Sequence, residues 1–330
     1  MEQLERTECL PVSEQIKSVK NGKQKNDKLR KKLKKKWQFY VMMIPIIAFL
    51  LVFSYYPMYG IVLAFKDYMP SKGIWGSEWI GFDHFKALFA LPDFPRAFRN
   101  TLIISFLSLV FCFPAPILLA LLLNEIKVKW FKKFTQTAIY LPNFISWVII
   151  AGIVNSLLSY SSGAVNNILE SFGLSRVEFL TEPKYFYPIL ILSQIWRDAG
   201  WGTIIYIAAI SSIDPSLYEA AQIDGCKRLK ATWYITLPSI MPIIIIMFVQ
   251  AVGNVLNSNF DAIFNLYNPT TYEVADVIDT LVYRTGIDKG EFERATAIGL
   301  FKTVINFILL MSAKKKKKKI NGYGIYEVAE

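Results

Sequence analysis

Residues 214–226 read DPSLYEAAQIDGC and lie between two long apolar stretches. Asp214 can cap the start of a helix, and Pro215 suits the first helical turn, where its missing backbone N–H has no intrahelical partner. Glu219 falls in the N-terminal half of this segment, the positive end of a helix. Gly225 suits the C-terminal end, where the backbone often turns left-handed. The stretch is therefore expected to form a short helix with defined ends.

Two small residues, Ala220 and Ala221, stand in the middle of this expected helix. Exposed small side chains let the backbone of another protein approach closely, so the helix would suit a docking role. A plain surface helix is the alternative that the local pattern leaves open.

Outward from this helix, six apolar stretches have the length of membrane-spanning helices, for which about 20 residues are needed. Four carry no charged residue, whereas one contains Arg197 and Asp198 and the last contains Lys302. The last apolar run, residues 295–313, is near the lower limit of length. A Ser- and Gly-rich turn at 159–163 ends the third span. The chain is therefore expected to be an all-α integral membrane protein, with spans at about 39–63, 101–123, 136–158, 187–210, 238–259 and 294–313.

The distribution of basic residues predicts the orientation. With the N-terminus inside, 25 of the 37 Lys and Arg fall in cytoplasmic segments and 10 in outer segments. Because Lys and Arg favour the cytoplasmic side, both termini are expected in the cytoplasm of a bacterium, at its plasma membrane. Basic residues beside apolar runs also point to lipid rather than nucleic acid as the partner. The expected parts are a disordered basic tail at 1–37, a six-helix domain at 38–313 with a loop at 211–238, and a basic tail at 314–330.

Few residues of the chain suggest metal or redox chemistry. Cys9, Cys112 and Cys226 share no metal-ligand or disulfide spacing, and His84 is the only histidine. No GxxxxGK[ST] phosphate-binding sequence is present. We therefore expect no metal, no bound cofactor and no ATP hydrolysis by the chain itself.

The helix and the residues after it resemble a known signature. Glu219-Ala220-Ala221 is followed after three residues by Gly225, after nine more by Ile235, and then by Leu237-Pro238. This spacing resembles the signature loop of permease subunits of binding-protein-dependent ABC importers. The resemblance implies that the loop couples the permease to an ATPase through Glu219, Ala220, Ala221, Asp224, Gly225, Ile235, Leu237 and Pro238.

The resemblance extends over nearly the whole chain after the N-terminal tail. Residues 37–45, 56–68 and 321–324 are similar to carbohydrate permeases of the maltose-type class, in particular the subgroup that serves complex oligosaccharides. It implies a type I ABC importer permease fold that forms half of a pore. The implied partners are a second homologous permease, two ATPase subunits that hold ATP and Mg, and an extracellular or periplasmic solute-binding protein.

Polar residues within apolar spans mark a candidate substrate pathway, because polar side chains are costly in lipid. In the fourth span, a first set of polar residues is spaced by three, four and seven residues, so its members share one face of the helix. In the fifth span, a second set and Asp261 share one helix face. Lys302 and Asn306 lie one turn apart in the sixth. Amides, hydroxyls and a Trp suit a sugar, whereas interhelical bonding, such as a salt bridge from Arg197 to Asp198 or Asp261, is the alternative. The two sets are Gln194, Arg197, Asp198 and Trp201, and Gln250, Asn254, Asn257 and Ser258.

Two other functions are the alternatives for this chain. An ion-coupled secondary transporter would need carboxylates within the membrane, and Asp198 is the only one inside a predicted span. A membrane enzyme would need clustered acid, base or metal residues, for which the outer group Glu273, Asp276 and Asp279 is the candidate. A solvated helix face is the simpler interpretation of that group.

Overall fold

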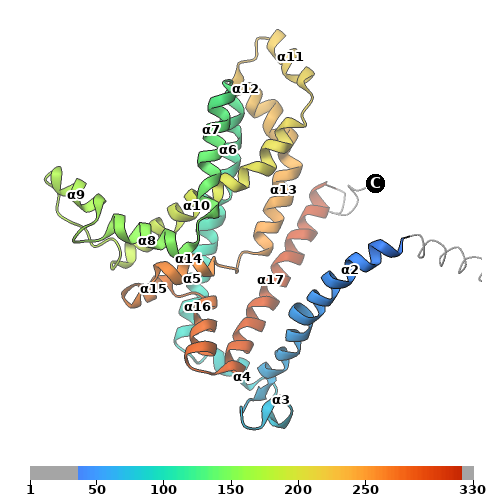
Figure 1. Ribbon diagram of the computed structural model, residues 1–330, viewed down its shortest axis with the longest axis vertical. Coiled ribbons are helices and arrows are strands. Elements are labelled where there is room, and N and C mark those ends of the chain that lie inside the picture. The colour runs from blue at the N-terminus through green and yellow to red at the C-terminus, as the bar shows by residue number, and fades with distance from the viewer. Residues whose placement is uncertain (1–35, 322–330) are drawn as a thin grey trace, which may run out of the picture. The chain divides into compact units, whose positions relative to one another are not determined.

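The computed structural model describes residues 36–321, with side chains described as far as Ser312 (Figure 1). The all-α prediction is confirmed, because helices make up nearly all regular structure in these residues. A two-residue antiparallel ladder joins β1 (Lys66–Asp67) to β2 (Glu78–Trp79). The chain divides into two compact units, Met1–Gly60 and Ile61–Glu330. The predicted N-terminal tail, apart from its last two residues, lies outside the described residues.

Helices occur in the described parts of both units. The first unit contains α2 (Trp37–Leu50) and the π-helical turn Leu51–Tyr55, and the 3-10 segment Tyr56–Phe65 that follows spans the boundary at Gly60. The second unit contains α3 (Gly73–Gly76), α4 (Asp83–Leu88), α5 (Asp93–Leu107), α6 (Pro114–Glu125), α7 (Lys129–Tyr140), α8 (Trp147–Leu158), α9 (Ala164–Ser171), α10 (Pro183–Ser211), α11 (Pro215–Ile223), α12 (Arg228–Ala231), α13 (Leu237–Gly253), α14 (Phe260–Leu266), α15 (Tyr272–Ala275), α16 (Ile278–Tyr283) and α17 (Phe292–Asn321).

Three long helices contain a π-helical turn that ends two residues before a proline. These turns are Leu51–Tyr55 before Pro57, Ser108–Cys112 before Pro114, and Thr232–Thr236 before Pro238. A proline ring clashes with the carbonyl four residues back and cannot donate to it. Widening the preceding turn by one residue moves that carbonyl aside, so the helix continues past the proline.

Helix α10 lies at the centre of the second unit, packed along α6 and α7 and also touching α13 (Figure 1). Two glycines permit this close packing. A Cβ on Gly200 would lie 1.9 Å from the carbonyl oxygen of Ile139, and a Cβ on Gly202 would lie 2.9 Å from Pro116. Both distances are shorter than van der Waals contact, so no side chain fits at either position.

Among the described residues, four helices are long and apolar enough to cross a membrane: Trp37–Phe65, Asp93–Glu125, Arg228–Gly253 and Phe292–Ser312. A bent pair, Lys129–Phe144 with Trp147–Leu158, would make five. Helix α10 covers the fourth predicted span and has 29 residues, but it is more polar and is not among them. Six helical segments thus match the six predicted positions, while their composition identifies four or five as spans.

The third predicted span is not one straight helix. Its two parts meet at 102° near Ile145 and Ser146. Pro142 lies in a 3-10 turn that ends the first part, and the Ser146 hydroxyl accepts a long bond from the backbone N–H of Ile149 at the start of α8. The turn after Leu158 is present as predicted.

The fifth predicted span ends earlier than expected, at Gly253 instead of residue 259. The Asn254 side chain donates to the Gln250 carbonyl, which competes with continuation of the helix. Asn259 then caps α14 by accepting from the backbone N–H of Ala262. Residues 254–259 are therefore a polar turn between two helices, and the shared helix face predicted for Gln250, Asn254, Asn257, Ser258 and Asp261 is wrong.

The last helix is longer than its apolar part. Helix α17 runs for 30 residues, and its backbone continues through the lysine run at 314–319. The short sixth apolar run therefore reflects where the lysines begin and not where the helix ends.

Candidate functional site

Helix α11 has the ends that its sequence predicts. The Asp214 carboxylate accepts from the backbone N–H of Ser216 at 2.9 Å, and this bond lowers the pKa of Asp214. At the other end Gly225 has a φ of +71°. The Cys226 N–H donates to the Ala221 carbonyl and the Gly225 N–H to the Gln222 carbonyl, which is the Schellman arrangement. The helix is thus closed by its own residues at both ends.

One side of α11 is fixed to neighbouring segments. The Tyr218 hydroxyl bonds the Thr236 hydroxyl at 2.8 Å, next to the start of α13. A cavity of about 280 Å³ separates the helix from the end of α6 at Asn124 and Glu125. Ala221 lines this cavity and is half-buried, so the expectation that both alanines are exposed holds only for Ala220.

The outer side of α11 and the segment after it are open. Glu219, Ala220 and Asp224 are exposed. Large apolar side chains are exposed there too, with Ile223 87% and Leu229 77% accessible. Figure 1 shows α11 at one end of α6, α10 and α13. Exposed apolar side chains around small residues are typical of a docking surface.

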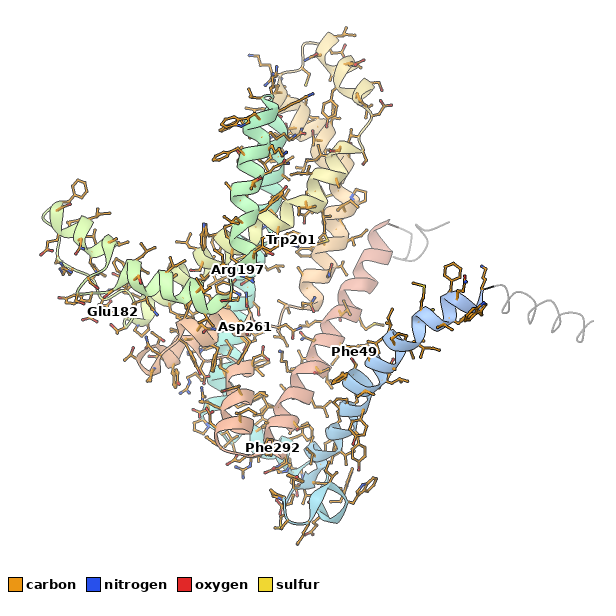
Figure 2. The ribbon with its side chains drawn as sticks, viewed as in Figure 1. Phe49, Glu182, Arg197, Trp201, Asp261 and Phe292 are labelled. Atoms are coloured by element: carbon orange, nitrogen blue, oxygen red, sulfur yellow. The ribbon has the colours of Figure 1, made fainter. Side chains whose placement is uncertain are left out.

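The polar residues predicted on α10 divide into two groups. Gln194 is buried, and its side-chain oxygen accepts from the Ser108 hydroxyl at 3.2 Å and the Cys112 thiol at 3.5 Å. Arg197 pairs with Asp198 at 2.7 Å. This is the salt bridge that the sequence left open as the alternative to a substrate pathway, and both of its residues lie on α10. Trp201 is half exposed (Figure 2).

The Arg197–Asp198 pair stabilises the bend between α7 and α8. Arg197 donates to the Ile145 carbonyl at 3.2 Å and lies over the Trp147 ring, 5.1 Å from its centroid. Asn143 donates to Asp198 at 3.2 Å. The charged side chains thus satisfy polar groups where the helix is interrupted, a structural role that leaves Asp198 paired.

Gln194 meets the turn at 254–259 around a cavity of about 290 Å³. Asn254, Asn257 and Ser258 line it from the other side, whereas Gln250 does not. The contact across the cavity is fixed by Ser105, which donates to the Val255 carbonyl. Of the first predicted set only Gln194 lines this cavity, whereas three members of the second set line it from a turn instead of a helix face.

Asn257 and Ser258 also line a larger groove of about 860 Å³, bounded by α14, α16 and α17. The turn is held against α17 by Asn306, which accepts from the Leu256 N–H and donates to Asn257, both at 3.2 Å. The two cavities thus share amide and hydroxyl groups.

A profile of the family described as "Binding-protein-dependent transport system inner membrane component" matches residues 112–315, which include α11 and most of the cavity lining. The chain belongs to this family. The resemblance inferred from the Glu-Ala-Ala loop is thereby confirmed, and the chain is a permease component located in a membrane.

Two relatives of this permease come from Bacillus subtilis (strain 168). The polygalacturonan/rhamnogalacturonan transport system permease protein YteP is 45% identical over 304 residues, which cover 92% of this chain and 95% of that protein. Protein LplB is 42% identical over 291 residues, covering 88% and 91%.

A solved structure shares the fold of the permease. A chain in the crystal structure of a bacterial ABC transporter involved in the import of the acidic polysaccharide alginate is 47% identical, with a TM-score of 0.82. The match covers 89% of this chain and 99% of that chain. The permease is also similar to a chain in the crystal structure of a bacterial alginate ABC transporter in complex with alginate pentasaccharide-bound periplasmic protein, with 46% identity and a TM-score of 0.82. The type I permease fold is thus confirmed.

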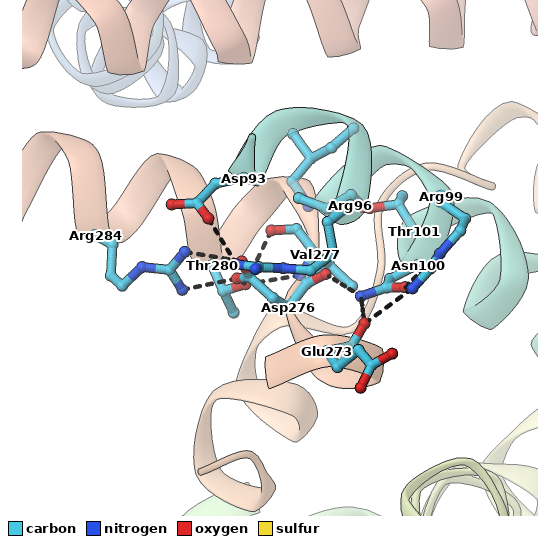
Figure 3. Close-up of polar contacts among 12 residues, drawn as sticks. Asp93, Arg96, Arg99, Asn100, Thr101, Glu273, Asp276, Val277, Thr280 and Arg284 are labelled. Carbon is cyan, nitrogen blue, oxygen red and sulfur yellow. Dashed lines mark hydrogen bonds and ion pairs between the residues drawn. The ribbon is translucent and has the colours of Figure 1, made fainter. Parts of the chain in front are cut away.

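One polar centre of the permease, around Asp276, was not predicted from the sequence (Figure 3). Asp276 is fully buried and accepts two bonds from Arg284, at 2.7 and 2.8 Å, and one from Thr280. Arg96 of α5 approaches the same carboxylate at 3.3 Å. The bidentate contact raises the pKa of Arg284 above its ordinary value. The solvated-face interpretation is wrong for Asp276, which instead ties α5 to α15 and α16.

Asn100 completes this centre by donating to the carbonyls of Glu273 and Asp276, at 2.9 and 3.0 Å. Asn100 lies more than 170 residues before Glu273 and Asp276 in the chain. No spacing rule would connect them, so only the fold reveals the centre.

Proposed function

We propose that this permease is one of two transmembrane subunits of an ATP-driven importer of oligosaccharides, and that α11 is its contact with a cytoplasmic ATPase. The observation that carries the proposal is the geometry of α11. The helix is closed at both ends, fixed on one side by Tyr218 and exposed on the other at Glu219 and Ala220. A rigid projecting helix can transmit movement of a docked subunit to α13, whose start it contacts.

Oligosaccharide is the substrate class that the cavities favour. Asn254, Asn257 and Ser258 offer amide and hydroxyl groups, and Phe260 and Tyr283 line the groove beside them. Sugars present hydroxyls to bond and apolar faces for aromatic rings to stack on. The relatives support the choice, since they are named for polygalacturonan/rhamnogalacturonan and for alginate.

The remaining partners follow from the same proposal. A second permease would complete the pore, two ATPase subunits would supply ATP and Mg, and a binding protein outside would deliver the sugar. Both termini and α11 would lie in the cytoplasm. The permease itself would hold no cofactor.

The test is sugar uptake by the reconstituted complex of both permeases, the ATPase and the binding protein. Uptake should require ATP, and Ala220→Arg should abolish it by blocking the exposed side of α11. Ser312→Arg, which also introduces an arginine at an exposed position, here at the end of α17 before the lysine run, should leave uptake unchanged. Uptake driven by an ion gradient without ATP would contradict the proposal.

A further inference from the structure

The larger groove contains one ion pair in an otherwise uncharged lining. Lys302 of α17 donates to the Asp279 carboxylate of α16 at 2.5 Å, and the two side chains are 12% and 23% exposed. Every other lining residue described for the groove is uncharged. This ion pair requires an explanation, because Lys302 lies within the sixth predicted span, where a charge is costly.

Packing between the two helices does not supply that explanation. The core here is apolar, with Ile278 and Leu281 of α16 against Ala297 and Ile298 of α17. Removing two charges from water costs about as much as their attraction returns, so a well-packed apolar pair would hold the helices together equally well. Charged residues inside a membrane protein instead tend to mark the path of a ligand.

Lys302 has bonding capacity left for a ligand. An ammonium group has three donors. One reaches Asp279, and within the described part of the chain this is the acceptor that the ammonium has. Two donors of this groove-lining side chain are thus left for a ligand.

The surroundings of the pair fit a saccharide. Tyr283 and Phe260 lie 5.8 Å apart, ring to ring, in the groove wall. Ser258 is buried, and its hydroxyl has no hydrogen-bond partner among the described residues. A ligand that brought hydroxyls, an apolar face and a negative charge would meet a partner for each.

We propose that Lys302 binds the carboxylate of a uronate-containing oligosaccharide, with Asp279 as the counter-ion that holds the ammonium in place when the groove is empty. The inference rests on the proposed function and specifies the substrate as acidic. A charge-assisted bond to Lys302 would favour uronates, and the nearby Asp279 would weaken that bond enough to permit release. The relatives agree, since alginate is described as acidic and a galacturonan is by name a polymer of a uronic acid.

The experiment compares trigalacturonate with its methyl ester in the reconstituted complex. The measured quantity is the ratio of kcat/KM for the acid to that for the ester. Asp279→Asn with Lys302→Gln removes both charges and keeps polar groups of similar size, so the ratio should fall about tenfold or more. Asp279→Asn alone removes a competing carboxylate, so the ratio should rise. Lys289→Gln, which removes an exposed positive charge outside the groove, is the matched control.

An unchanged ratio in the double variant would overturn the inference. So would an equal loss of both substrates, because the pair would then serve only the packing of α16 on α17. Binding of trigalacturonate to the purified complex, measured by titration calorimetry, gives the same comparison without transport. If no saccharide is imported, the proposed function fails, and the calorimetric comparison still decides the role of Lys302. Asp279→Asn alone, which keeps Lys302, covers poor folding of the double variant, because an unchanged ratio in that single variant would also count against the inference.

Discussion

Gly225 ends α11 with a φ of +71°, and a Cβ at this position would meet no atom within 4 Å. The need for glycine is therefore purely conformational. The left-handed region costs other residues about 1–2 kcal/mol, and asparagine less than most.

Gly225→Val should therefore weaken the end of α11 by about that amount and reduce ATPase activity coupled to sugar uptake. Gly225→Asn should retain most of the coupling, because asparagine tolerates the same φ. The measurement is the ratio of sugar imported to ATP hydrolysed in proteoliposomes. Equal losses in both variants would show that the size of the side chain matters here and not the backbone.

Asp276 sits in a centre where one substitution removes several bonds. Asp276→Asn leaves Arg284 without its bidentate partner and should lower the free energy of unfolding by about 3–5 kcal/mol. Thermal unfolding of the detergent-purified permease is the measurement.

Glu273→Gln is the matched control for Asp276→Asn, because Glu273 is exposed and engages the centre through its backbone carbonyl. The change should be within about 0.5 kcal/mol. A similar stability for both variants would mean that the buried contacts of Asp276 do not stabilise the fold.

Among the elements, α10 packs too closely against α7 to accept a side chain at Gly200. Gly200→Ala would push a Cβ into the Ile139 carbonyl of α7. Because backbone cannot move aside as a side chain can, this overpacking should cost about 1–3 kcal/mol and lower the unfolding temperature.

Gly152→Ala in α8 provides the comparison for Gly200→Ala, since its Cβ would meet nothing within 4 Å. Alanine is the better helix former, so stability should stay the same or rise by up to about 1 kcal/mol. A loss of stability as large as that of Gly200→Ala would rule out close packing as the reason for glycine in α10.

The elements also show which features the sequence predicts well. Helix α11 was predicted correctly because its start and stop signals, Asp214 and Gly225, act within one helix length. The end of α13 was not, because the turn that follows it depends on Asn306, some 50 residues further along the chain. The bend at Ile145 was missed since the apolar run is continuous through it, and its partner Arg197 lies on another helix. Local chemistry is readable from sequence, whereas interruptions sustained by distant side chains are not.

Considered as a whole, the permease is constrained by the number of times the chain crosses the membrane. With the N-terminus inside, Trp37–Phe65 and Asp93–Glu125 bring the chain back to the cytoplasm. Helix α10 is the next long helix before α11. If the bent pair α7–α8 did not cross, α10 would deliver α11 to the outer side, where no ATPase is present. The docking role of α11 therefore requires that the bent pair cross, despite its 102° angle.

Single-cysteine labelling tests this topology in a background without native cysteines. Ser161→Cys, in the turn after α8, should react with an impermeant maleimide from outside the cell. Trp130→Cys, at the start of α7, and Cys226 after α11, restored alone in that background, should react only in inverted vesicles. Reaction of position 161 from the cytoplasmic side would make the bent pair re-entrant. It would then place α11 and the lysine run at 314–319 on the outer side, against the preference of basic residues for the cytoplasm, and the coupling role of α11 would fail with it.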